Sequence, residues 1–249
     1  MKRFFKWLFY NRGTQFIVVW FIHFYIWLVC KTSKITIKGN TDKIKKYLKT
    51  GKGLVLFTWH GRILLAPMVV QQIFKDHKIS VLSSARSEGQ IAGKLSNTFG
   101  INNIIGYNVK NKNLKNFKNL SNKRREEFHE RYGKNITSMR EIMKRLKEGD
   151  LFLLAADAPK GPAYKFNSSL GEIVKKMDCG MSFGVPSCKR KKIFKSWDKF
   201  EFPYPFNEIV FEFGAVYTTK TANLEKKAKD DINTIMGRND RSFNNSPPP

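Results

Sequence analysis

Acidic residues and cysteines are scarce in this chain. Its 249 residues hold 20 Asp and Glu against 46 Lys and Arg, which gives a formal net charge of +26 at pH 7. This imbalance indicates an anionic partner, such as nucleic acid, an anionic membrane surface or an acidic protein. The cysteines, Cys30, Cys179 and Cys188, are three in number and widely separated. They form neither a disulfide framework nor a four-cysteine zinc site, so we expect a reducing compartment. No metal site is predicted.

Long hydrophobic runs are also rare. The mean hydropathy of −0.42 excludes a polytopic membrane protein. One run, residues 16–30, is apolar except for His23, has basic residues on both sides and lacks a small-residue cleavage pattern at its end. We therefore predict a membrane-associated helix in which Phe16, Trp20, Phe24 and Trp27 act as anchors. A buried core helix is the alternative, and both a spanning and an interfacial position stay open.

Apolar runs of strand length alternate with helical periodicity along the rest of the chain. Hydrophobic residues make up 41% of the sequence, which is enough for a substantial core. We predict an α/β fold with a central, mostly parallel sheet flanked by helices, preceded by the N-terminal hydrophobic helix. The expected divisions are an anchor (1–33), a main domain (34–220), and a C-terminal helix with a disordered tail (221–249). The predicted strands are 34–38, 54–59, 79–82, 101–106, 150–156, 181–185 and 209–213, and the predicted helices are 91–99, 136–147 and 172–177.

Three of the predicted strands end in a cluster of polar residues. In open α/β sheets, ligands bind beyond the carboxyl ends of the strands, so such clusters are expected to converge. His60 is the histidine that directly follows a predicted strand, whereas His77 and His129 lie among charged residues. The three clusters hold these candidate side chains: His60 and Arg62, then Arg86 and Glu88, then Asp157 and Lys160.

These clusters occur in a recognisable order. Residues 59–65 (WHGRILL), 84–89 (SARSEG), 157–162 (DAPKGP) and 195–206 (KSWDKFEFPYPF) together resemble a bacterial branch of the lysophospholipid acyltransferase-like superfamily. That branch includes the late (secondary) acyltransferases of lipid A biosynthesis, enzymes of lipopolysaccharide assembly. The resemblance extends over roughly residues 35–217, together with the hydrophobic segment before them.

The resemblance implies transfer of a fatty acyl chain from an acyl carrier protein thioester to a hydroxyl of a lipid A precursor. The enzyme would lie at the inner membrane, with its catalytic domain on the cytoplasmic face and no cofactor beyond the acyl donor. His60 would be the general base. The superfamily places an acid five positions after this histidine, where this chain has Leu65. Glu88 or Asp157 is therefore expected to be the partner of His60.

Other residues receive roles from the same resemblance. Arg62, Arg86 and Lys160 are expected to face anionic head-group phosphates. Backbone amides near Gly61 or Gly161 are candidates for stabilising the oxyanion. Gln90, Ala158 and Lys160 depart from the residues usual in the branch. Residues 196–206 are predicted to be a loop that packs Trp197 and Phe200 on the sheet.

Alternative functions stay open. The nearer one is acylation of a lysophospholipid or glycerol phosphate. A different class is a non-catalytic basic module that binds membranes or nucleic acid, which the missing acid at Leu65 favours. Residues 110–147 hold 13 Lys and Arg against 4 Glu, either as a solvated face or as a surface for acidic acyl carrier protein. We find no nucleic-acid-binding motif, so the expected partners are the carrier protein, anionic lipid and the membrane, and not nucleic acid.

Overall fold

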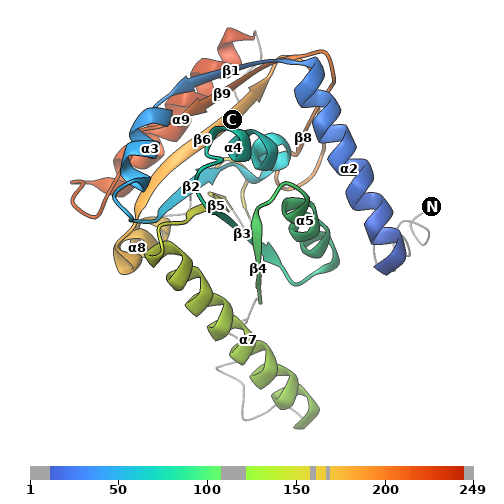
Figure 1. Ribbon diagram of the computed structural model, residues 1–249, viewed down its shortest axis with the longest axis vertical. Helices are drawn as coiled ribbons and strands as arrows, with labels where there is room; N and C mark the ends of the chain where they lie inside the picture. Colours follow the sequence, from blue (N-terminus) through green and yellow to red (C-terminus); the bar gives the residue numbers. More distant parts are fainter. Residues whose placement is uncertain (1–11, 108–121, 158–160, 167–168, 244–249) are drawn as a thin grey trace.

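A single mixed sheet forms the centre of the molecule (Figure 1). The computed structural model describes residues 12–107, 122–157, 161–166 and 169–243. Within them, seven strands lie in the order β1-β9-β6-β2-β5-β3-β4, and every neighbouring pair is parallel except β6 with β9. The predicted α/β fold with a mostly parallel sheet is confirmed. The strands are β1 (Lys34–Gly39), β2 (Leu54–Thr58), β3 (Ile79–Ser84), β4 (Asn102–Gly106), β5 (Leu151–Ala155), β6 (Gly180–Cys188) and β9 (Glu208–Phe213).

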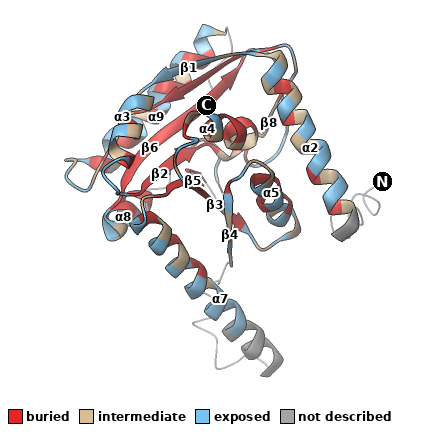
Figure 2. Ribbon diagram, in the orientation of Figure 1, coloured by how far each residue is buried: buried red, intermediate tan, exposed pale blue. Residues whose placement is uncertain are grey.

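Both faces of the central strands are buried. Val55 and Phe57 of β2 belong to a core cluster that includes residues of α7, α8 and α9, whereas Leu54 and Leu56 belong to one that includes residues of α3 and α4. This arrangement explains why the central strands are continuous apolar runs rather than alternating ones. Figure 2 shows the buried residues concentrated in the sheet. The helices are α2 (Arg12–Thr32), α3 (Thr41–Leu48), α4 (Ala66–Ile73), α5 (Ser87–Thr98), α7 (Asn122–Lys147), α8 (Ser169–Met177) and α9 (Leu224–Ser242), and η1 (His60–Leu65) is a 3-10 helix.

Some short elements differ from the sequence prediction. The segment 196–206, predicted as a loop, contains β8 (Glu201–Pro203), which pairs with β7 (Lys191–Ile193) in an antiparallel hairpin. Two prolines, Pro203 and Pro205, made a loop the natural interpretation. However, Pro203 is tolerated because β8 belongs to a two-stranded ribbon, where a strand edge needs no N–H donor. The predicted tail after 243 lies outside the described residues.

Helices beyond both ends of the predicted main domain pack into the fold. In α9, Ala228, Ile232 and Ile235 are buried in the same cluster as Phe57 and Phe183. In α2, Val19, Ile26 and Val29 are buried in a cluster that includes residues of α4 and α5. The hydrophobic core therefore extends across the boundaries expected at residues 33 and 221.

The opposite face of α2 is apolar and exposed. Among the described residues, α2 is the one helix long and apolar enough to cross a membrane, by length and composition. Its exposed large side chains recur at helical spacing, and they include all four predicted anchors. These side chains are Phe16, Ile17, Trp20, Phe21, Phe24 and Trp27. A membrane association of this helix is thus compatible with its surface, while its inner face is part of the protein core.

The two faces of α2 predict opposite effects of truncation on stability. Ile26 is fully buried, so Ile26→Ala should lower the free energy of unfolding by about 2–5 kcal/mol. Phe21 is 72% exposed, so Phe21→Ala should change it by less than about 0.5 kcal/mol. Urea unfolding in one mild detergent, followed by near-ultraviolet circular dichroism, measures both. Equal effects of the two substitutions would contradict a helix that is packed on one face only.

Candidate active site

The carboxyl ends of β2, β5 and β3 lie at one edge of the sheet. These strands are adjacent and parallel, so the segments that follow them leave the sheet on the same side. His60 begins η1 directly after β2, and Asp157 lies two residues after β5. The sequence-predicted convergence is thus observed for these two residues. The cluster at the start of α5 contributes Arg86 and Glu88, whose side chains are exposed.

The ring of His60 contacts an acid that the sequence did not indicate. Its Nδ1 lies 2.7 Å from Oδ2 of Asp198, in the segment between β7 and β8. The Asp198 side chain is 7% exposed, whereas that of His60 is 40% exposed. The indole of Trp197 lies 5.0 Å from the imidazole, centroid to centroid. The arrangement is therefore a buried carboxylate behind an imidazole that solvent or a substrate can reach.

The protonation state of Asp198 follows from its surroundings. Burial raises the pKa of this carboxyl group, but hydrogen bonds from Ser196 and His60 and the charge of His60 more than offset it, so the pKa lies below its ordinary value. Ser196 Oγ donates to Asp198 Oδ1 at 2.5 Å. An ionised carboxylate only accepts hydrogen bonds, so Nδ1 of His60 must be the donor. In the neutral imidazole, Nε2 is then the nitrogen that can take a proton.

The two acids predicted as partners of His60 have other positions. Asp157 is buried and holds the backbone, because its Oδ1 accepts from the His60 amide at 2.8 Å and its Oδ2 from the Tyr164 amide at 3.1 Å. Glu88 is exposed in the first turn of α5. The predicted pairing of the His60 ring with Glu88 or Asp157 is therefore corrected to Asp198. A separation of 138 residues explains why spacing alone did not reveal this pair.

Two glycines make room for the segment that carries Asp198. A Cβ on Gly61 would lie 2.2 Å from the Asp198 carbonyl oxygen, and one on Gly161 would lie 2.7 Å from the Trp197 ring. Gly161 also has φ of 69°, which disfavours any side chain. Its amide donates to the Asp157 carbonyl at 3.0 Å, so it is already engaged and does not fit the expected oxyanion role.

Arg62 lies in a buried network of charged side chains and not at the protein surface. Its guanidinium, with 1% of the side chain exposed, forms two hydrogen bonds to Asp240 of α9, at 2.6 and 3.0 Å. It also lies 3.0 Å from Glu201 of β8, which pairs with Lys191 at 2.9 Å. Burial opposes the charge of Arg62, but Glu201 and Asp240 keep its pKa above the ordinary value. The predicted head-group role of Arg62 is therefore wrong, because the side chain joins η1, β8 and α9.

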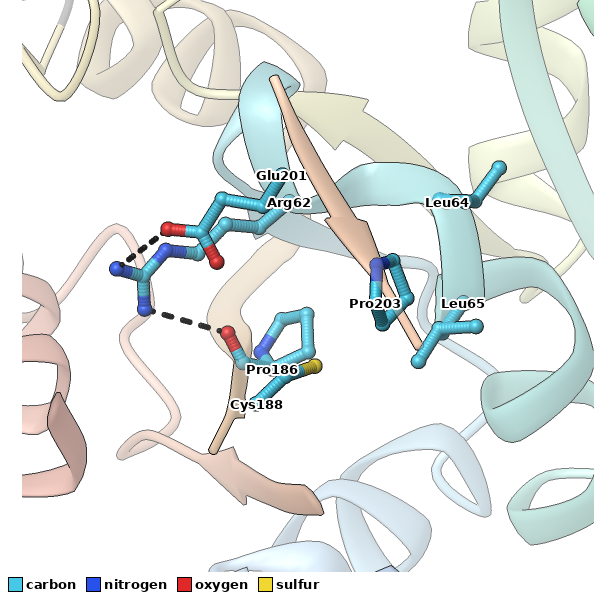
Figure 3. A pocket seen from close by; sticks show the side chains of 7 residues that line it. All are labelled: Arg62, Leu64, Leu65, Pro186, Cys188, Glu201 and Pro203. Carbon is cyan, nitrogen blue, oxygen red and sulfur yellow. Dashed lines mark hydrogen bonds and ion pairs between the residues drawn. The ribbon is translucent and has the colours of Figure 1, made fainter. Parts of the chain in front are cut away.

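Figure 3 shows the small cavity beside this network, between Arg62, Glu201 and Pro203. Its volume of about 10 Å³ is room for a single water at most. This cavity is therefore too small to hold an acyl chain or a head group. Of the other predicted head-group ligands, Arg86 lies exposed just before α5, and Lys160 lies outside the described residues.

No family model matches the chain. It is similar to the uncharacterized protein RP090 of Rickettsia prowazekii (strain Madrid E), with 27% identity over 220 residues. The match covers 86% of this chain and 88% of that protein.

Loss of the Arg62 charge should be strongly destabilising. Arg62→Met leaves Glu201 and Asp240 buried without their main cation, so we expect a loss of about 3–5 kcal/mol in the free energy of unfolding. Arg86→Met removes an exposed charge and should change it by less than about 0.5 kcal/mol. Urea titrations of both variants measure the difference. A stable Arg62→Met protein with weakened lipid binding would restore the head-group role.

The lowered pKa of Asp198 predicts a pH-dependent contribution to stability. A carboxyl group whose pKa is lower in the folded state stabilises the fold above its unfolded pKa, and this contribution is lost as the pH falls through the folded pKa. The difference in unfolding free energy between wild type and Asp198→Asn should therefore be larger at about pH 6 than at about pH 3. Denaturant titrations at both pH values measure it. A difference that grows toward acid would contradict the assigned direction.

Proposed function

We propose that this protein is a membrane-associated acyltransferase that moves a fatty acyl chain from a thioester to a hydroxyl group of a lipid. The observation that carries the proposal is the pair of His60 and Asp198, with Nδ1 held by a buried carboxylate and 40% of the histidine side chain exposed. This geometry suits an imidazole that accepts and returns a proton. Support also comes from the resemblance of the residues around His60 to the acyltransferase-like superfamily.

The reaction would proceed through general base catalysis. Nε2 of His60 takes the proton of the lipid hydroxyl while the hydroxyl oxygen attacks the carbonyl carbon of the thioester. Asp198 stabilises the imidazolium that results. The tetrahedral intermediate then collapses and breaks the carbon–sulfur bond. The leaving thiolate takes the proton back from Nε2. The cysteines are poor alternative nucleophiles, because burial raises the pKa of Cys179 and of Cys188 to about 12.

The resemblance favours acyl carrier protein as the donor and a lipid A precursor as the acceptor, at the cytoplasmic face of the inner membrane. A lysophospholipid or glycerol phosphate is the nearer alternative acceptor. The non-catalytic alternative had its best support in Leu65, where the superfamily has an acid. Leu65 is a buried apolar residue, and Asp198 supplies the carboxylate from another part of the chain. We therefore favour an enzyme over a binding module.

Substitution of His60 should nearly abolish acyl transfer. Loss of a general base costs about 10²–10⁴-fold in rate, so His60→Ala should reduce turnover by this factor while the protein stays folded. Glu88→Gln is the matched control, because this exposed acid does not orient the ring, and it should keep nearly wild-type turnover. Transfer of a radiolabelled acyl chain from acyl carrier protein to extracted lipids measures both.

The same variants identify the acceptor in cells. Mass spectrometry of cells without the protein should show lipid A lighter by one acyl chain. Expression of wild type or Glu88→Gln should restore the full mass of lipid A, whereas expression of His60→Ala should not. Accumulated lysophospholipid with normal lipid A would indicate the alternative acceptor. A folded His60→Ala protein with wild-type turnover would overturn the mechanism.

A further inference from the structure

The position of α2 on the protein limits how this helix can meet a membrane. Contacts with the rest of the fold extend over its length, from Gln15, whose side chain accepts from Lys94 at 2.6 Å, to the buried Val29. Midway, His23 lies 2.8 Å from the hydroxyl of Thr98. A helix that crosses a bilayer is surrounded by lipid or by other spanning segments over about 30 Å. The main neighbour of α2 is instead α5, which carries Lys94, and α4 and η1 contact α2 as well.

The outer face of α2 fits a helix that lies along a membrane. Its exposed apolar residues form a stripe of which Phe16, Phe21 and Phe24 are each more than half exposed. An interfacial helix buries one apolar face, rich in Trp, Phe and Leu, at the boundary between head groups and acyl chains. The inner face remains packed against the protein, so the whole helix can rest on lipid without leaving its neighbours.

A second element presents the same kind of surface. The hairpin of β7 and β8 exposes Ile193, Phe194 and Trp197, with exposed fractions of 54%, 43% and 46%. The exposed charges of residues 189–200 are all positive, because the acid among them, Asp198, is buried at the His60 ring. The cations with exposed side chains are Lys189, Arg190, Lys192 and Lys195. Apolar side chains interleaved with cations are typical of surfaces that bind anionic lipid.

Aromatic contacts make the hairpin continuous with α2. The ring of Tyr25 stacks on Phe202 of β8 at 4.6 Å, and its hydroxyl donates to the Pro203 carbonyl at 2.7 Å. Phe202 in turn meets Phe194 edge to face at 6.3 Å. The two apolar surfaces are thus fixed relative to each other by side-chain packing.

Phe206, after β8, has no role in the core that would explain its position. Its side chain is 74% exposed, and its backbone is left-handed with φ of 55°. Its amide donates to the hydroxyl of Thr32 at the end of α2 at 3.1 Å. A bulky residue in this backbone region is unfavourable, so the fold holds an aromatic side chain outward beside α2 against a local energetic cost.

From these observations we propose that the protein binds an anionic bilayer through two elements at once, the outer face of α2 and the β7–β8 hairpin, with α2 in the plane of the membrane. The hairpin carries Asp198 and Trp197, so the bound state places His60 at the lipid surface. That consequence for catalysis rests on the proposed function, whereas the binding itself does not. Lipid is the favoured occupant because the cations of the hairpin complement anionic head groups and the surface continues that of α2.

Vesicle binding by the full-length protein tests the role of the hairpin. Ile193→Glu with Phe206→Glu adds two negative charges to the proposed contact, and it should weaken co-sedimentation with phosphatidylglycerol-containing vesicles about tenfold or more. The matched control is Ile136→Glu with Met139→Glu on α7, two exposed apolar residues that should tolerate the same change. Equal vesicle binding by the two double variants would overturn the hairpin contact. Acyl transfer in detergent, measured on the same variants, would test the proposed acyltransferase function separately.

Fluorescent labels on α2 test its orientation on the same vesicles. Probes at Phe16→Cys and Phe24→Cys should be quenched to a similar depth by lipids brominated at defined carbons, because both positions lie on the face turned to the bilayer. A probe at Met139→Cys should stay unquenched. Depths that differ by most of a monolayer would show that α2 crosses the membrane and would overturn the in-plane position.

Discussion

Asp198 reaches His60 because the backbone between β7 and β8 lies directly against the turn that follows β2. Three consecutive residues of that turn depend on this approach. His60 forms the hydrogen bond to the carboxylate, Gly61 provides the space for the Asp198 carbonyl, and Arg62 pairs with Glu201 a few residues further on. The residue types around the histidine thus follow from one close contact between two segments far apart in the sequence.

The buried charges around Arg62 connect the turn after β2 and the β7–β8 segment to the rest of the fold. Burying charges is costly unless each has partners, and here Arg62 and Lys191 face Glu201 and Asp240. Asp240 belongs to α9, so the C-terminal helix binds the turn through Arg62, and Asp157, just after β5, binds the His60 amide. The pair of His60 and Asp198 is consequently positioned by groups on β8, on α9 and in the segment that follows β5, which suits a site whose geometry must not vary.

Much of the fold was predictable because its strands are buried on both faces and therefore appear as continuous apolar runs. The position of His60 just after the end of β2 was predictable for the same reason. The partner of His60 was not, because hydrogen bonds between distant segments leave no periodic pattern, and Asp198 lies among prolines and aromatics that suggest a packing loop. Arg62 was misassigned because an arginine near a histidine has the same sequence pattern whether it faces a ligand or an internal carboxylate. Asp198 does lie in residues 195–206, one of the four segments that carry the resemblance, but the resemblance gave it no role.

The central claim is that His60 and Asp198 act as one unit in acyl transfer. Turnover of His60→Ala, Asp198→Asn and the double variant, measured with the same acyl thioester and lipid acceptor, tests it most directly. If Asp198 acts through the imidazole, the double variant should be no slower than His60→Ala alone, because the carboxylate has nothing left to orient. Losses that multiply in the double variant, or an Asp198→Asn protein with wild-type turnover, would contradict the account.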